Sequence, residues 1–398
     1  MVKKIIFIVA DGLSDSPVKQ LGNKTPLEKA KTPNLDFLAE KGICGLIYPF
    51  VLSGQKKPES DTCHLALFGY DPNIFYLNRG PYEAFGAGIR LEKGDVALRA
   101  NFSTIKQNKV IDRRAGRIEK TAPLIRALEK IKIKGVKIIL KKSYGHRLVV
   151  VLRGKNICPD IESNDPKQAD KKVKEIKAKI EKAGFTANVL NQFLTRANFI
   201  LENHPLNKQR VKKGLLPANY LLLRGAGQFK ETLSFKEKYG LKACCIAGGA
   251  LYKGIAEVLG MKIIKVKGAT GLPDTDLKAK FRAVEKCFNK YDFIFLHIKA
   301  TDSLAEDGNF AGKTRFIEKI DRKIKKIINL KNALIVFTAD HSTCSEMKGH
   351  CKELIPFLIF GSAQDRVKKF SEKNCGRGSL GRIQQLDLIQ KAFKMAEK

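Results

Sequence analysis

Short runs of aliphatic and β-branched residues that stop abruptly constrain the fold of this chain more than any other sequence feature. Four such runs lie near its two ends, and they are typical of strands buried on both faces of a sheet. They are Ile5–Ala10, Phe293–Ile298, Ala333–Thr338 and Ile355–Phe360. Helical patterns such as Leu27–Lys41 and Lys313–Ile328 separate them. The alternation predicts an α/β fold in which helices cover a mostly parallel sheet and ligands bind at the carboxyl ends of its strands.

The middle of the chain has a different pattern. Shorter strand candidates and basic helices follow one another there, without acidic residues at the strand ends. The strand candidates are Lys109–Ile111, Val136–Lys141 and Arg147–Leu152. We therefore predict two domains: an outer domain of residues 1–90 and 231–398, and a smaller α/β domain of residues 91–230 inserted into it.

Positive charge is spread through the whole chain. Lys and Arg exceed Asp and Glu by 75 to 40, a formal net charge of +35 that attracts polyanions or small phosphorylated substrates. The densest basic run, Lys167–Lys182, has apolar residues at Val173, Ile176 and Ile180, and this spacing predicts an amphipathic helix with a solvated basic face. Because no basic motif interleaved with aromatic residues occurs, the sequence argues against nucleic acid as the main partner.

Secretion and membrane signals are weak. Asp11 and Gly12 end the N-terminal apolar run too early for a signal peptide, and no stretch approaches the roughly 18 apolar residues that a membrane span needs. The nine cysteines include no CxxC pair, so reduced thiols are expected, with Cys63 and Cys344 as packing residues. We expect a folded cytoplasmic protein without a membrane partner.

Acidic or histidine residues stand at or beyond the ends of the outer strands. They are Asp11, Asp302, Asp340, His341 and His350. One such residue alone is commonly a helix cap. Several strand ends that deliver carboxylate and imidazole groups to one sheet edge suit a pair of divalent cations instead. We therefore predict a two-metal site at this edge.

A candidate nucleophile, Ser60, lies in the segment Pro58–His64. The pattern predicts a turn that enters a helix, with Ser60 near the helix start. A helix N-terminus favours anions, and a metal bound to the serine oxygen would lower the pKa of the hydroxyl. The alternative is that Ser60 is only an N-cap.

Glycine-rich segments do not indicate a nucleotide cofactor. The segments Arg224–Gly227 and Gly248–Gly249 lack the strand–GxGxxG–helix context of a dinucleotide site. No GxxxxGK[ST] loop is present either. We therefore expect no nucleotide.

Seven motifs follow one another in a characteristic order along nearly the whole chain. They are Asp11-Gly12, LGNKTPLEKAKTPNLDFLAEKG, SDTCHLALFGYDP, GPYEAFGAGI, KATD at Lys299–Asp302, ADHST at Ala339–Thr343, and the segment from His350 to Pro356. In this order they resemble the archaeal-type 2,3-bisphosphoglycerate-independent phosphoglycerate mutases of the alkaline phosphatase superfamily. The resemblance implies an alkaline-phosphatase-like sheet with an inserted domain.

The resemblance also implies metal-binding and catalytic roles. One divalent ion would be held by Asp11, Ser60, Asp340 and His341, with Ser60 as the nucleophile that becomes phosphoserine. The second ion would be held by Asp302 and His350. Mn²⁺ or Mg²⁺ is expected, with Co²⁺ or Zn²⁺ as alternatives.

One position departs from the family's pattern. Four residues after Asp302 the family has histidine, whereas this chain has Glu306. A carboxylate can still coordinate and would favour harder ions than an imidazole does. The alternatives are that Asp307 takes this role or that the second metal site is impaired.

Substrate-binding charge is expected from arginine, because its planar fork suits phosphate and carboxylate. The turn Asp112–Arg117 contains Arg113, Arg114 and Arg117, and it matches the DRRAGR motif of the family. Further positions that match are Arg224 and Lys253, and Arg99 is an additional candidate. The alternative is a surface-charged turn without a ligand.

The implied reaction is the interconversion of 3-phosphoglycerate and 2-phosphoglycerate in glycolysis and gluconeogenesis. It would proceed through phosphoserine in a closed site that excludes water. The main alternative is a metal-dependent phosphoester hydrolase of the same superfamily, which would release the phosphate to water. A third hypothesis is a basic binding protein that has lost catalysis.

Overall fold

The computed structural model describes residues 3–397, and the chain divides into two compact units. Unit 1 comprises Met1–Tyr76 and Thr232–Lys398, and unit 2 comprises Leu77–Glu231. The outer domain was expected to extend to residue 90. Residues 77–90 instead lie in unit 2, because helix α5 (Arg79–Gly86) packs on two strands of that unit, β3 and β7.

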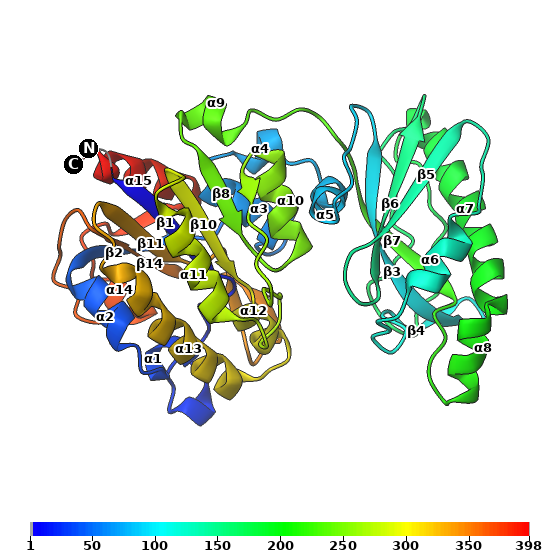
Figure 1. Ribbon diagram of the computed structural model, residues 1–398. Coiled ribbons are helices and arrows are strands. Elements are labelled where there is room, and N and C mark those ends of the chain that lie inside the picture. Colours follow the sequence, from blue (N-terminus) through cyan, green and yellow to red (C-terminus); the bar gives the residue numbers. More distant parts are fainter. Residues whose placement is uncertain (1–2, 398) are drawn as a thin grey trace. The chain divides into compact units, whose positions relative to one another are not determined.

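An eight-stranded sheet forms the centre of unit 1 (Figure 1). Its order is β15-β2-β14-β11-β1-β10-β8-β9. The strands are β1 (Lys4–Ala10), β2 (Gly42–Tyr48), β8 (Ala243–Ile246), β9 (Lys262–Ile263), β10 (Phe293–Ile298), β11 (Ala333–Thr338), β14 (Ile355–Phe360) and β15 (Arg382–Gln384). Only β14 runs antiparallel to its neighbours in this sheet. The prediction of a mostly parallel sheet is therefore confirmed, and β1, β10 and β11 lie side by side.

Helices cover both faces of this sheet (Figure 1). One face packs against α2 (Pro33–Glu40), α11 (Leu277–Phe288) and α13 (Phe310–Ile328). The other packs against α3 (Ser60–Leu67), α10 (Ala250–Val258) and α15 (Leu388–Ala396). The remaining short elements of unit 1 are η1 (Lys19–Leu21), α1 (Pro26–Lys29), α4 (Pro72–Phe75), α9 (Phe235–Tyr239), α12 (Ala300–Glu306), β12 (Ser342–Cys344), β13 (Gly349–Cys351), α14 (Glu372–Cys375) and η3 (Gln385–Asp387).

Two helix predictions have different outcomes. The pattern at Lys313–Ile328 is confirmed as part of α13. The pattern at Leu27–Lys41 is interrupted, since α1 ends at Lys29 and α2 begins at Pro33. A proline disfavours helical backbone at the residue before it, and Thr32 accordingly has φ −125° and ψ 54°.

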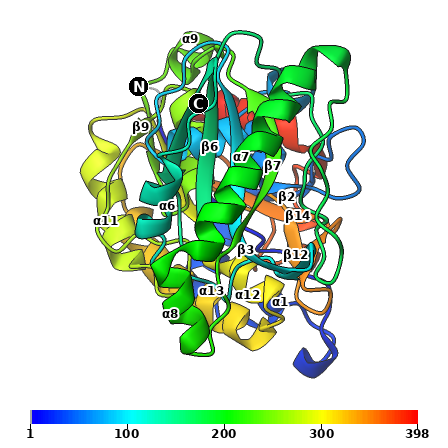
Figure 2. The same ribbon diagram turned by 90° about the vertical axis from the view of Figure 1, so that its right-hand side faces the viewer.

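Unit 2 is a five-stranded sheet with helices on both faces. The strands are β3 (Val96–Lys106), β4 (Lys109–Asp112), β5 (Val136–Lys142), β6 (Arg147–Gly154) and β7 (Tyr220–Gln228), and all the pairings are antiparallel. One face packs on α6 (Ala122–Leu128) and α7 (Gly184–Asn203), the long helix in Figure 2, and the other packs on α5. Two further elements are η2 (Glu181–Ala183) and α8 (Pro205–Lys212).

The predicted helix at Lys167–Lys182 is wrong, because nearly all of this segment is irregular and extended. Val173 and Ile176 are buried, but Ile180 is exposed. The side chain of Asn191 on α7 bonds both the backbone N–H and the carbonyl of Ile176, which removes the partners that a helix would need. An apolar spacing of three and four residues therefore arises here without a helix.

The expectation that all nine cysteines are reduced is also wrong for one pair. Cys344 on β12 and Cys351 on β13 form a disulfide across this hairpin, whereas the other seven cysteines are free and buried. Cys344 is therefore more than a packing residue. Separately, no helix in the range 3–397 has both the length and the apolar character that a bilayer crossing requires.

Candidate metal centre

The predicted metal ligands converge at the carboxyl ends of three neighbouring strands. Asp11 follows β1 directly, Asp302 lies on α12 just after β10, and Asp340 and His341 follow β11. His350 lies on β13, whose hairpin returns towards the same edge. Parallel strands place their carboxyl ends together, which explains why residues nearly 300 positions apart meet here.

Asp11, Asp340 and His341 form the first group of potential metal ligands. All three are fully buried. Nε2 of His341 lies 3.6 Å from Oδ1 of Asp11 and 3.2 Å from Oδ2 of Asp340. Oδ2 of Asp340 is buried without a hydrogen-bond donor. A buried carboxylate oxygen in this state is suited to a cation, so this group fits a divalent ion.

Ser60 belongs to the same group by position. It is the first residue of α3, the N-cap residue is Glu59, and its Oγ lies 3.0 Å from Nε2 of His341. The alternative that Ser60 is only an N-cap is therefore wrong. Its hydroxyl faces His341, one of the predicted metal ligands, and the residue is almost fully buried.

Asp302, His341 and His350 form the second group. Nε2 of His350 lies 3.5 Å from Oδ1 of Asp302, and the rings of His341 and His350 stack with centroids 3.8 Å apart. Nδ1 of His350 donates to the carbonyl of Pro58 at 2.9 Å, which holds the ring in place. His341 therefore contacts ligands of both groups.

Thr343 determines which ring nitrogen of His341 carries the proton. Its hydroxyl donates to Oδ1 of Asp302 at 2.7 Å, so its oxygen can accept from Nδ1 of His341 at 3.2 Å. Nε2 of His341 then carries a lone pair directed at Ser60. Gly12 allows this arrangement: it has φ +61°, and a Cβ there would lie 2.4 Å from Oγ1 of Thr343.

Lys299 lies between the two groups, and the sequence did not single it out. Its ammonium is 3.2 Å from Oδ1 of Asp11 and 2.5 Å from Oδ2 of Asp302. Burial would raise the pKa of Asp11, but Lys299, His297 and His341 together hold that pKa well below its usual range. Burial and the neighbouring charge of Asp11 raise the pKa of Asp340 well above its usual range.

Glu306 is not a member of either group. It lies at the end of α12 with its side chain exposed. The residue as a whole is exposed, but neighbouring groups remove part of the hydration of its carboxyl. This loss, together with the negative charge of Asp302, raises the pKa of the carboxyl. A ligand role for Glu306 stays a prediction, as does the alternative role of Asp307.

Two histidines that the sequence did not single out lie beside the first group. His64 on α3 and His297 on β10 are fully buried and, with Asp11, form a third set of clustered side chains. Burial lowers the pKa of His64 to about 4 and that of His297 to about 3, so both rings are neutral. Each lies within an apolar run, where a sequence does not show whether the ring packs in the core or faces a site.

Two of the predicted arginines, Arg99 and Arg224, lie on the face of the unit 2 sheet that packs on α5. Arg99 of β3 is paired in register with Arg224 of β7, and Asn101 is paired with Arg147 of β6. Burial is the main cause that lowers the pKa of Arg99 well below its usual range, and the neighbouring arginines lower it further. Burial also lowers the pKa of Arg224 to about 10. Arg79 and Arg147, which the sequence did not single out, are among those neighbours. Positive charges held close together favour an anionic ligand.

Asp165 orients two of these arginines. Arg113 donates to both carboxylate oxygens of Asp165, at 3.1 and 2.6 Å, and Arg224 donates to it at 3.4 Å. Arg114 and Arg117 lie on the exposed turn of the DRRAGR motif. Lys253, in contrast, is half-buried on α10 of unit 1. Their roles as substrate ligands stay predictions.

Comparison with known proteins gives the family. A family model described as the Metalloenzyme superfamily matches residues 3–395. The 2,3-bisphosphoglycerate-independent phosphoglycerate mutase 1 of Archaeoglobus fulgidus is 45% identical over 403 residues, covering 98% of this chain and 97% of that protein. The chain belongs to the 2,3-bisphosphoglycerate-independent phosphoglycerate mutase family. The corresponding mutase 1 of Methanocaldococcus jannaschii is 42% identical, with coverages of 95% and 93%.

Solved structures agree with this membership. A protein from Pyrococcus horikoshii matches with a TM-score of 0.86 and 34% identity, covering 100% of this chain and 98% of that one. A cofactor-independent phosphoglycerate mutase from Thermoplasma acidophilum matches with a TM-score of 0.72 and 33% identity, covering 99% and 100%. The resemblance inferred from the motifs is therefore confirmed.

Metal binding by this member of the mutase family should depend on pH through His350. Burial opposes its protonation, but the hydrogen bond and charge of Asp302 raise its pKa to about 9. A metal ion must displace this proton, so the Kd for Mn²⁺ should fall by up to about tenfold per unit between pH 7 and pH 9 and then level off. The pKa of His341, lowered by burial to about 3, adds no slope in this range.

Free Mn²⁺ measured by electron paramagnetic resonance at pH 7, 8 and 9 would test this dependence. The variant His350→Asn should bind the ion more weakly and without the slope. Without metal, the stabilisation from the raised pKa of His350 should be full below the unfolded pKa of about 6.5 and be lost as pH rises through about 9. A Kd for the unmodified protein that is constant from pH 7 to pH 9 would contradict this dependence.

Proposed function

We propose that this chain interconverts 3-phosphoglycerate and 2-phosphoglycerate, without 2,3-bisphosphoglycerate, through a phosphoserine at Ser60. Family membership supports the reaction. The observation that carries the choice of nucleophile is the buried Oγ of Ser60. It lies 3.0 Å from Nε2 of His341, the nitrogen that also lies near the carboxylates of Asp11 and Asp340. A serine in such surroundings can be activated to attack a phosphate.

Two divalent ions are part of this proposal. Asp11, Ser60, Asp340 and His341 would hold one ion, and Asp302 and His350 would hold the other, with Glu306 as an additional ligand. When bound, the ions would offset the charge of the transferring phosphoryl group and lower the pKa of the serine hydroxyl. Carboxylate oxygens favour Mn²⁺ or Mg²⁺, and the imidazoles also admit Co²⁺ or Zn²⁺.

The residues of the chain would act in two mirrored steps. Oγ of Ser60 loses its proton and bonds to phosphorus while the bond from phosphorus to the 3-oxygen of glycerate breaks, and that oxygen gains a proton. In the return step the 2-hydroxyl of glycerate loses its proton and takes the phosphoryl group, and Ser60 regains its hydroxyl. Glycerate must be retained between the steps, and the arginines Arg99, Arg113, Arg114, Arg117 and Arg224, with Lys253, would bind its carboxylate and the phosphate.

Conversion of 3-phosphoglycerate by metal-stripped protein refilled with Mn²⁺ tests the function. The assay omits 2,3-bisphosphoglycerate and measures 2-phosphoglycerate and free phosphate in parallel. Formation of 2-phosphoglycerate without free phosphate would support the mutase. Free phosphate without the isomer would mean the alternative, a phosphoester hydrolase, which family membership does not favour.

Replacement of Arg224 by lysine should weaken substrate binding. Lysine keeps the charge but loses the planar fork, and hydrogen bonds to charged groups contribute about 1.5–3 kcal/mol each, so KM for 3-phosphoglycerate should rise by roughly 10- to 100-fold. Steady-state kinetics would measure it, with Arg126→Lys on the exposed face of α6 as the matched control. An Arg224→Lys variant with the KM of the control would remove Arg224 from the proposed substrate site.

A further inference from the structure

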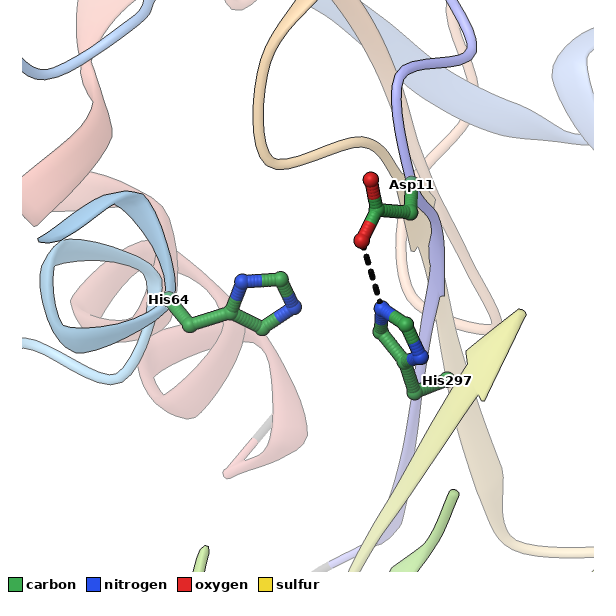
Figure 3. Close-up of side chains that lie close together, drawn as sticks. All are labelled: Asp11, His64 and His297. Carbon is green, nitrogen blue, oxygen red and sulfur yellow. Dashed lines mark hydrogen bonds and ion pairs between the residues drawn. The ribbon is translucent and has the colours of Figure 1, made fainter. Parts of the chain in front are cut away.

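The third set of clustered side chains consists of Asp11, His64 and His297. The proposed mechanism uses Asp11 but neither of the two histidines. Figure 3 shows the three side chains facing one another. They come from the end of β1, from α3 and from β10, and each offers one ligand atom within 4.8 Å of the others. All three are fully buried, so bulk water does not solvate the polar atoms between them.

His64 presents a lone pair to this space. Its Nδ1 lies 2.7 Å from the carbonyl oxygen of Ser60, which only accepts hydrogen bonds, so Nδ1 carries the proton. Nε2 is therefore unprotonated, and it is buried without a hydrogen-bond partner. In Figure 3 a nitrogen of this ring points towards Asp11 and His297. An imidazole held by a carbonyl on one nitrogen, with the other nitrogen bare, has the arrangement of a metal ligand.

Asp11 can serve two sites at once because its oxygens face different groups. Oδ1 lies 3.2 Å from the ammonium of Lys299 and 3.6 Å from Nε2 of His341, on the side of the proposed two-metal centre. Oδ2 lies 2.9 Å from Nε2 of His297, on the side of the third set. A carboxylate with this orientation can bridge two cations.

The walls of this space are aromatic and rigid. The ring of Tyr252 stacks on His297 with centroids 3.5 Å apart and lies 4.9 Å from the ring of His64. Phe295 packs against both histidines. Packing of this kind holds both imidazoles in place. It leaves Nε2 of His64 without a hydrogen-bond partner, whereas Nε2 of His297 is hydrogen-bonded to Oδ2 of Asp11 and would exchange that bond for the ion.

We propose that Asp11, His64 and His297 form a third divalent-ion site that shares Asp11 with the two-metal centre. Two imidazoles and one carboxylate favour a transition ion, such as Zn²⁺, Co²⁺ or Mn²⁺, over Mg²⁺. Metal–nitrogen bonds of about 2.1 Å span ligand atoms up to about 4.2 Å apart, so shifts of a few tenths of an ångström bring all three atoms into range. His297 binds through Nε2 with its proton on Nδ1, which has no hydrogen-bond partner in either tautomer.

The number of bound ions per chain tests this site. Metal-stripped full-length protein is incubated with Zn²⁺, freed of loosely bound ions by gel filtration, and analysed by mass spectrometry of the metal. The variants His64→Gln and His297→Gln should each hold one ion fewer than the unmodified chain. The control variant His204→Gln, at the N-cap of α8 in unit 2, should hold the same number as the unmodified chain. With Mg²⁺ in place of Zn²⁺, the two site variants should not differ from the control.

The position of the ion gives a second measurement that needs no variant. Crystals of the unmodified chain soaked in Zn²⁺ should show an anomalous-scattering peak between Asp11, His64 and His297. Equal ion counts in all the variants, or no peak at this place, would overturn the proposal. Neither result depends on mutase activity, because the third site is counted and located without turnover.

Discussion

Replacing Ser60 with alanine will lower the kcat for conversion of 3-phosphoglycerate to 2-phosphoglycerate by at least about 10⁴-fold. The alanine side chain is nearly isosteric, so the predicted ligands Asp11, Asp340 and His341 should keep their positions while the attacking oxygen is lost. No other hydroxyl is hydrogen-bonded to Nε2 of His341 among the described residues. The phosphoryl group then has no serine oxygen to accept it at this position.

This result should be accompanied by loss of the covalent intermediate. Protein incubated with phosphate-labelled substrate and quenched in acid should carry label on the unmodified chain and none on Ser60→Ala. Ser379→Ala, at an exposed serine of unit 1, is the matched control and should keep both activity and label. Turnover in Ser60→Ala close to that of the control would assign the nucleophile elsewhere.

The candidate site could be predicted from the sequence where strand ends determine it. Asp11 directly follows β1 and Asp340 lies two residues after β11, and the parallel topology brings them together regardless of their separation along the chain. Ser60 was placed near a helix start by local pattern alone. These residues meet in the structure because secondary structure and topology are sufficient to fix their positions.

Other features depend on side-chain packing that a sequence pattern does not contain. His64 and His297 lie inside apolar segments, so only the faces of α3 and β10 show that they approach Asp11. The disulfide between Cys344 and Cys351 depends on the register of a short hairpin. The segment Lys167–Lys182 has a helical spacing, but bonds from Asn191 hold its backbone in another conformation.

Lys313 fastens together two segments that adjoin the predicted metal ligands. This fully buried ammonium on α13 donates to the carbonyls of Ser14 and Thr343, at 3.1 and 2.9 Å, and to Oδ2 of Asp15 at 2.9 Å. Asp15 in turn accepts from the backbone and the hydroxyl of Ser345. The loop after β1, which carries Asp11, is thereby fastened to the β12 segment that follows His341.

Replacement of Lys313 by methionine should destabilise unit 1 by about 3–5 kcal/mol, because the carboxylate of Asp15 is left buried without its cation. Methionine fills most of the volume of the lysine side chain, so the loss reports the charge and its hydrogen bonds more than packing. Urea unfolding of the metal-free protein measures it. Lys319→Met, at an exposed position of the same helix, is the matched control and should change the free energy of unfolding by no more than about 0.5 kcal/mol.

The double variant Lys313→Met with Asp15→Asn distinguishes the effect of the unpaired charge from the effect of the other hydrogen bonds that Lys313 makes. Removing both charges eliminates the unpaired buried carboxylate, so the double variant should be more stable than Lys313→Met alone, although the introduced amide cannot restore the bonds to Ser14 and Thr343.

Mn²⁺ affinity should fall in Lys313→Met, since the loop with Asp11 and the hairpin with His350 are no longer fastened together. A Lys313→Met variant as stable as Lys319→Met would show that the buried pair contributes nothing to holding the ligands in place.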